Sequence, residues 1–321
     1  MGTCADAPPD VGKLAKCQAK RARLRGKGKV NADTRHVSRG VMRTMARSAR
    51  LPPIYLAKCP MWDSSSNSKV LKDLAFLPIH ETLDNMVSDG DAESWCSIDG
   101  SQEGFRADLE DWGARLGMDV ATNLFACIGL WGDSAPFGKR QSLFLILFTV
   151  LSGAFRDRYW IVALTKSAVC KCGCFGRCTF DLAFQVIAWS FRALAAGQYP
   201  AQDHEGTPFP AASHRGKLAG KPLKLRAACL AKYGDWQWFK QVLNRQGWRG
   251  EGRDLQICWI CPGTLRDKCP CYDFTLQASW RRGLGRMNDF FTNASFQNFF
   301  VSAIFSIPGF RAQMCKPDWM H

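Results

Sequence analysis

A chain of 321 residues, 46% of them hydrophobic, is long enough to bury the core of one large domain or two small ones. Its net charge of +15 exceeds the magnitude of about 2 to 8 that solubility asks of a small domain, so we expect a polyanionic partner, nucleic acid before an acidic membrane surface. The longest apolar run, Leu143 to Phe155, is shorter than the roughly 18 residues that cross a bilayer, and residues 1–12 lack the apolar segment of a signal peptide. These absences predict a soluble, intracellular protein whose 15 cysteines serve metal sites or stay free thiols. The basic N-terminal tail also lacks an amphipathic apolar face, which argues against a membrane partner.

The first 119 residues change from basic to acidic. Residues 1–50 hold thirteen Lys and Arg against three Asp and are predicted to be a disordered basic tail. Such a tail could serve as a nuclear-import signal or a non-specific DNA arm, and a purely solubilising role fits equally well. Residues 51–79, with LPPIYL and DSSSNS, are interpreted as a linker. Residues 80–119 form an acidic lead-in, in which apolar spacing predicts a helix over Gly104 to Met118.

Residues 120–321 alternate strand and helix signals and are predicted to form one domain. Short turns join three apolar runs, 124–131, 143–150 and 158–164, which favours an antiparallel meander. A helix is predicted over Thr179 to Ala196, followed by strands at roughly Leu223 to Leu230 and Leu255 to Ile260. The predicted fold class is α/β, with a mixed five-stranded sheet, helices and cysteine-rich insertions.

Two aspartates follow predicted strands. Asp133 comes after the first strand, and Asp235 comes after the fourth. Asp133 alone fits a turn residue that caps its own backbone. The pair fits a metal site if the first and fourth strands are neighbours, as in the ribonuclease-H-like fold. That fold collects carboxylates at adjacent strand ends and holds two divalent metals about 3.5–4 Å apart for phosphodiester chemistry.

Several motifs carry a resemblance to a known family: GLWGDSAPFGKRQS, CKCGCFGRCTFD, KYGDWQWFK, ICWIC and the terminal DWMH. Over residues 124–321 the chain resembles transposon-derived proteins repeated in dinoflagellate genomes and, more distantly, CACTA-type and Plavaka-type cut-and-paste transposases. The resemblance implies a ribonuclease-H-like fold, Asp133 and Asp235 as catalytic acids, and Mg²⁺ or Mn²⁺ as catalytic metal. It also implies DNA as partner, a nuclear location, and oligomers with other transposase copies.

The resemblance also marks a departure. In those transposases a C-x-x-C pair and a D-x-x-H pair, matching Cys258/Cys261 and Asp318/His321, precede a third acid on a late helix. The chain ends at His321, so the domain is expected to be C-terminally incomplete: a truncated copy, one exon of a longer product, or a domesticated relic. With two of three acids, metal affinity and turnover are expected to be severely impaired.

Nine residues are candidate zinc ligands. The favoured site joins Cys258 and Cys261 to either Cys269 and Cys271 or His321, because four-coordinate zinc takes closely spaced ligands from two segments. A second candidate is the tight run of Cys170, Cys172, Cys174 and Cys178. Its alternate residues diverge unless the backbone folds back, which Gly173 and Gly176 would allow. Buried free thiols are the alternative for both groups.

Two functions stay open at this point. The first is a DNA transposase-type domain, or its inactive remnant, that uses two-metal phosphodiester cleavage and strand transfer. The second is a non-catalytic, zinc-stabilised nucleic-acid-binding protein whose binding residues lie in the basic tail. Trp236 and Trp238, which flank Asp235, either stack on unpaired bases or pack a helix onto the sheet.

Overall fold

The computed structural model describes residues 51–87, 92–98, 102–136, 142–153, 158–174, 176–234, 238–239, 242, 277, 302–311 and 314–317. The chain divides into two compact units, Met1–Pro53 and Ile54–His321, and every helix and strand named below belongs to the second. The predicted basic tail over residues 1–50 lies outside the described residues. Among the helices that are described, none is both long enough and apolar enough to cross a membrane.

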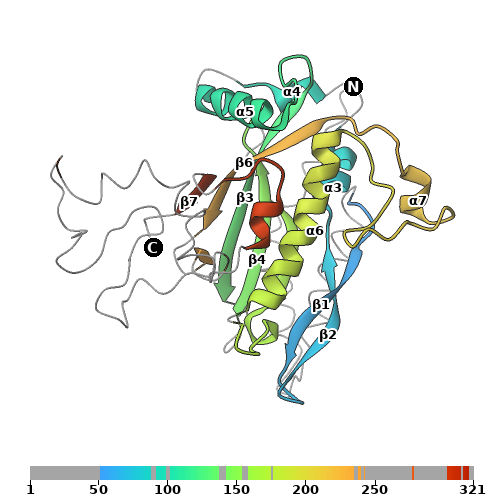
Figure 1. The fold of residues 1–321 in the computed structure, drawn as a ribbon, viewed down its shortest axis with the longest axis vertical. Coiled ribbons are helices and arrows are strands. Elements are labelled where there is room, and N and C mark those ends of the chain that lie inside the picture. Colours follow the sequence, from blue (N-terminus) through green and yellow to red (C-terminus); the bar gives the residue numbers. More distant parts are fainter. Residues whose placement is uncertain are drawn as a thin grey trace, which may run out of the picture. The chain divides into compact units, whose positions relative to one another are not determined.

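A mixed sheet of seven strands organises the second unit, in the order β1-β2-β5-β4-β3-β6-β7 (Figure 1). The predicted meander is confirmed. Strands β3 (Phe125–Pro136), β4 (Ser142–Val150) and β5 (Arg158–Thr165) pair antiparallel in succession. The alternating burial of Phe144, Ile146 and Phe148 on β4 shows the period of two that a sheet packed on one face requires.

The other side of β3 carries parallel strands. Strand β6 (Arg226–Gly234) pairs parallel with β3, which confirms the predicted adjacency of the first and fourth strands. Strand β7 (Cys315–Pro317) pairs parallel with β6 and closes this edge of the described sheet. The strand predicted over Leu255 to Ile260 lies outside the described residues, so its place stays a prediction.

The linker interpretation of residues 51–79 is wrong. This range holds β1 (Tyr55–Asp63) and β2 (Ser68–Phe76), an antiparallel hairpin at the edge of the sheet. The seven strands that the structure describes are this hairpin, four of the five predicted strands, and β7, which was not predicted. Its turn lies in the DSSSNS segment, where Asn67 takes a left-handed φ of 47°. The sheet tolerates Pro60 because β1 is an edge strand, where a missing N–H need not break a ladder.

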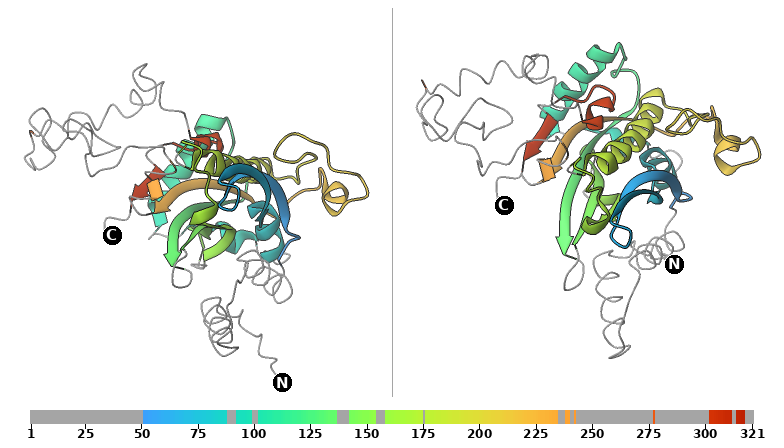
Figure 2. Two further views of the ribbon diagram at one scale, coloured as in Figure 1. Left: turned by 90° about the horizontal axis from the view of Figure 1, so that it is seen from below. Right: turned by 60° about the horizontal axis from the view of Figure 1, so that its bottom comes forward.

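Helix α6 (Arg177–Ala196) covers one face of the sheet, close to the predicted bounds of Thr179 to Ala196 (Figure 2). Fourteen of its twenty residues are buried, including the predicted stripe of Phe180, Phe184, Ile187, Phe191 and Leu194. The helix ends at Gly197, whose φ of 70° is the left-handed conformation common at helix C-termini. Packing of this stripe on the sheet forms the main core.

Shorter elements surround this core. Helix α5 (Glu103–Leu116) confirms the helix predicted near 104–118, and its Trp112 indole donates to the Pro308 carbonyl at 2.8 Å. That carbonyl follows the 3-10 turn η5 (Ala303–Ser306). The remaining described elements are α3 (Ile79–Met86), α4 (Ala92–Cys96), α7 (His214–Leu218) and the 3-10 turn η2 (Lys166–Ala168).

Candidate metal centre

Four cysteines converge in the segment that runs from the end of β5 into the first turn of α6. The Sγ atoms of Cys170, Cys172, Cys174 and Cys178 all lie within 4.8 Å of one another. The Cys172 and Cys178 sulfurs are 3.9 Å apart. Among the described residues, this is the only group of three or more His, Cys, Asp or Glu side chains that could hold a metal ion. We call it the cysteine cluster.

Two glycines let the backbone fold back as the sequence suggested. Gly173 and Gly176 have φ angles of 86° and 89°, a left-handed conformation that side chains with a Cβ rarely adopt. At Gly176 there is also no room, since a Cβ would lie 2.7 Å from Val169 Cγ1. The first turn of α6 then closes on this bend, where the Arg177 N–H donates to the Cys174 carbonyl at 3.0 Å.

The cluster has the dimensions of a structural zinc site. Zn–S bonds of about 2.3 Å place the sulfurs of a tetrahedral site about 3.8 Å apart. The Cys172–Cys178 sulfur separation of 3.9 Å matches that edge, and a metal would draw the other sulfurs inward from at most 4.8 Å. Four thiolates would fill the coordination of zinc and leave no open position for a substrate, so the cluster suits a structural role.

The thiols of the cluster do not titrate alike. Burial raises the pKa of the Cys170 thiol to about 12. Burial also acts to raise the pKa of Cys174, but hydrogen bonds from the Cys178 backbone and from neighbouring thiols outweigh it and lower that pKa to about 7. The lowered pKa favours the thiolate form of Cys174, which is the form that binds metal.

Hydrogen bonds tie the cluster to the edge of the sheet. The Cys170 N–H donates to Thr179 Oγ1 at 3.0 Å, and that hydroxyl donates to the Pro60 carbonyl on β1 at 2.6 Å. The Cys59 thiol contacts the Thr179 carbonyl at 3.8 Å. The cluster thus connects the start of α6 to the β1–β2 hairpin, two segments more than a hundred residues apart in the chain.

Asp133 lies inside β3 rather than in a turn beyond its end, which corrects the sequence interpretation. Local turn residues suggested that the strand stops near 131, but pairing with β4 continues to Pro136 and sets Asp133 opposite Leu145. The Asp133 side chain is exposed, and its Oδ1 accepts a hydrogen bond from the Ser134 N–H at 2.6 Å. Pairing with β6 ends one residue earlier, where Gly132 faces Gly234.

The remaining predicted ligands lie outside the described residues. They are Asp235, Cys258, Cys261, Cys269, Cys271 and His321. Asp235 is the next residue after Gly234 in the sequence, as Asp133 is after Gly132. The distance between the two carboxylates and the favoured zinc site at Cys258 and Cys261 therefore stay predictions.

Trp238 packs against the sheet, which supports the packing alternative over base stacking for this residue. It is 2% exposed and lies against Gly132, where a Cβ would fall 1.9 Å from the indole Cε2. The buried Lys232 ammonium lies 4.8 Å from the centroid of the same ring. Burial lowers the pKa of Lys232 to about 7. Trp236 lies outside the described residues.

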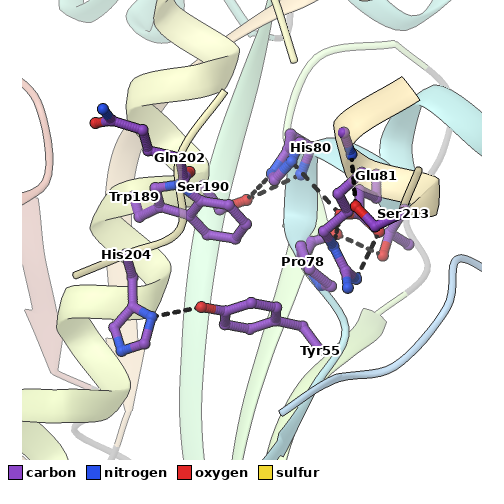
Figure 3. Close-up of polar contacts among 12 residues, drawn as sticks. Tyr55, Pro78, His80, Glu81, Trp189, Ser190, Gln202, His204 and Ser213 are labelled. Atoms are coloured by element: carbon purple, nitrogen blue, oxygen red, sulfur yellow. Dashed lines mark hydrogen bonds and ion pairs between the residues drawn. The ribbon is translucent and has the colours of Figure 1, made fainter. Parts of the chain in front are cut away.

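A buried polar network between α3 and α6 was not predicted from the sequence (Figure 3). His80 on α3 donates its backbone N–H to the Ser190 hydroxyl on α6 at 3.0 Å, and its Nδ1 lies 2.8 Å from the same oxygen. Glu81 accepts two hydrogen bonds from the Arg215 guanidinium of α7, at 2.6 and 3.0 Å. His80, Glu81 and Ser190 are each at most 2% exposed, so the network braces the fold and offers no access to a substrate.

The same network holds the segment between α6 and β6. The Tyr55 hydroxyl of β1 lies 2.5 Å from His204 Nδ1, and the Trp189 indole donates to the Gln202 carbonyl at 2.9 Å (Figure 3). Tyr55 also stacks on Trp189, with ring centroids 5.1 Å apart. His80 and His204 therefore have structural roles that their isolated positions in the sequence did not indicate.

Acidification is expected to destabilise the protein through His80. Burial lowers the pKa of His80 to about 3, with the Arg215 charge adding to the effect, whereas an unfolded histidine titrates near 6.5. The native state thus binds fewer protons than the unfolded state between these values, so stability is present above pH 6.5 and is lost as pH falls below it. Between pH 7.5 and pH 5, His80 should account for a loss of about 2 kcal/mol. The unfolding free energy from urea titration should fall less steeply with decreasing pH in His80→Gln than in the wild type. An equal fall in both proteins would show that His80 is not the source of the pH dependence.

Comparison with protein-family models, with curated proteins and with solved structures found no match in any of the three. Function is therefore inferred from the chemistry and placement of the residues above. Two features stand out in the described part of the chain: a cysteine cluster that can hold zinc, and an exposed aspartate on β3.

Proposed function

We propose that this chain carries a ribonuclease-H-like domain of the transposase type, which binds DNA and uses Asp133 and Asp235 to hold Mg²⁺ or Mn²⁺ for phosphodiester cleavage. The observation that supports the proposal is the pairing of β3 with β6. These are the first and fourth strands after residue 120; they are adjacent and parallel, and the facing residues Gly132 and Gly234 each precede an aspartate in the sequence.

The chemistry follows from that placement. Carboxylate oxygens are the ligands that Mg²⁺ and Mn²⁺ prefer. Metal held at this edge of the sheet would supply Lewis-acid stabilisation of charge on the attacking and leaving oxygens. Asp133 is exposed, and one of its carboxylate oxygens accepts a hydrogen bond from the Ser134 N–H, so the proposal assigns metal binding to a carboxylate that solvent can reach. The net charge of +15 favours association with the phosphodiester backbone.

Strand cleavage and strand transfer on supercoiled and linear DNA test the proposal. With Mg²⁺ or Mn²⁺, the wild type is expected to nick DNA. Asp133→Asn should reduce nicking by at least about a hundredfold, because a neutral amide is a poor ligand for a hard cation. Asp73→Asn, which alters another exposed strand aspartate, is the matched control. Equal nicking by the wild type and Asp133→Asn would assign the activity to another source and contradict the proposal.

One observation favours a second candidate, a zinc-stabilised nucleic-acid-binding protein without catalysis. Among the described residues the only convergent metal-ligand group is the cysteine cluster, and it belongs to the structural type. In that case, DNA binding would persist in Asp133→Asn, no metal-dependent nicking would occur, and removal of zinc would abolish binding together with the fold.

A further inference from the structure

A column of three stacked side chains crosses the sheet face opposite α6. Trp131 of β3 stacks on Tyr233 of β6, with ring centroids 4.4 Å apart and an interplanar angle of 19°. The guanidinium carbon of Arg158 on β5 lies 3.8 Å from the centroid of the Trp131 ring. The column therefore reaches across β6, β3, β4 and β5.

Strand alternation fixes the face on which the column lies. Gly132 and Lys232 face Trp238 and the α6 side of the sheet. Their strand neighbours Trp131 and Tyr233 consequently point to the other face. Asp133, two residues beyond Trp131 on the same strand, shares that face.

The column is accessible at one end. Arg158 is exposed, whereas Trp131 and Tyr233 are half-buried. Tyr233 covers one face of the indole and Arg158 covers the other, so a ligand meets the outer face of the guanidinium. In addition, the buried Nε1 of Trp131 has no hydrogen-bond partner within the described part of the chain.

The exposed guanidinium of Arg158 is suited to particular ligands. A planar cation held flat on an indole can stack on an unpaired base with its outer face and donate to phosphate with its edge. Prior stacking on Trp131 restricts the Arg158 side chain, so less conformational entropy is lost when a ligand binds. A paired base keeps its faces inside the duplex and cannot use this layer.

We propose that Tyr233, Trp131 and Arg158 form a platform on which an unpaired base of a single-stranded polynucleotide stacks, next to Asp133. The inference rests on the proposed nucleic-acid function and adds to it the strand state of the substrate. Arg158 is the contact layer, and the two aromatic rings are its support. The positive net charge of the chain suits a polyanion as the occupant.

Fluorescence anisotropy with the zinc-loaded full chain tests the platform. The probes are a labelled oligothymidylate, an oligouridylate of equal length and a DNA duplex, in buffer without Mg²⁺ or Mn²⁺ so that binding is separate from cleavage. Arg158→Lys keeps the charge but loses the planar group, and it should weaken single-strand binding by about five- to a hundredfold while leaving duplex binding unchanged. Trp131→Leu should have a similar effect. Oligouridylate bound more tightly than oligothymidylate, with the same loss in Arg158→Lys, would also support the platform and identify RNA as the source of the base.

Arg192→Gln is the control, because Arg192 is an exposed arginine on α6, across the sheet from the column. It should lower single-strand and duplex affinity slightly and equally, through net charge alone. Unchanged single-strand affinity in Arg158→Lys, or an equal loss for duplex, would overturn the platform while metal-dependent nicking still supported the proposed function. A wild type that binds none of the three probes would overturn both.

Discussion

Replacement of Cys172 and Cys178 by serine is expected to remove one zinc ion per chain and to lower the melting temperature by about 10 °C or more. The sulfurs of these residues lie 3.9 Å apart and make one edge of the cysteine cluster. Structural zinc contributes roughly 10–16 kcal/mol of apparent binding free energy in small domains, and that energy is folding energy. A loss of even about 4 kcal/mol shifts the melting temperature of a domain of this size by roughly 8–16 °C.

Zinc analysis and thermal unfolding of the same preparations measure this effect. The informative quantity is the difference in zinc content between the wild type and the variant, since Cys258 and Cys261 are candidates for a second zinc site. Cys96→Ser is the control, because Cys96 lies outside the cysteine cluster and should leave the zinc content unchanged. Unchanged zinc content in the double cysteine variant would mean that the four thiols are free, and the metal assignment would be wrong.

Arg215→Met is expected to cost about 3–5 kcal/mol of stability. The substitution leaves the Glu81 carboxylate, whose side chain is 3% exposed, without the charge that its two hydrogen bonds engage. Burial already raises the pKa of Glu81, and the Arg215 charge opposes that rise. The measurement is the unfolding free energy from urea titration. The double variant Glu81→Gln/Arg215→Met should recover part of the lost stability, because neither charge of the pair then remains at this site.

Lys58→Met provides the matched control for Arg215→Met. Lys58 and Asp73 form an exposed ion pair on the hairpin, and pairs of this kind contribute little to stability. A loss in Arg215→Met no larger than that in Lys58→Met would show that the buried network does not brace α7. A lower unfolding free energy in Glu81→Gln/Arg215→Met than in Arg215→Met would lead to the same conclusion.

The parts of the fold that could be predicted are those with long, regular apolar patterns. The stripe of α6 and the three runs of the meander each predicted their element within a few residues, because burial of one face imposes a visible period. The hairpin was not predicted, since its Pro60 and Ser-rich turn resemble a linker. The signal that was missed is the alternation of Tyr55, Ala57, Cys59 and Met61, all buried on one face of β1.

The candidate sites could likewise be predicted only where a local sequence pattern marks them. The cysteine cluster was visible because its ligands lie within nine residues, although the sequence favoured Cys258 and Cys261. The extension of β3 past Asp133 depends on pairing with β4, which local turn residues conceal. The Glu81–Arg215 pair joins residues 134 positions apart, and no local pattern predicts such a contact. Glu81 also illustrates that an acidic segment can carry a buried carboxylate when a distant arginine reaches it.

The stacked column on β3, β5 and β6 shares this dependence on tertiary structure. Trp131, Arg158 and Tyr233 are separated by 27 and 75 residues in the chain, and only the strand order brings them together. Register makes Trp131 and Tyr233 direct partners. The tryptophans that flank an acid in the sequence are instead Trp236 and Trp238, and the structure places Trp238 in the core.

Mn²⁺ binding to the zinc-loaded full chain, followed by electron paramagnetic resonance, measures whether Asp133 and Asp235 hold a divalent metal. The measurement does not depend on turnover, and Mn²⁺ prefers carboxylate oxygens whereas thiolates select zinc. We expect the wild type to bind Mn²⁺, Asp133→Asn and Asp235→Asn each to lose most of this binding, and Asp73→Asn to retain it. Equal Mn²⁺ binding by the wild type and Asp133→Asn would contradict a metal-holding role for Asp133 and, with it, the proposed phosphodiester chemistry.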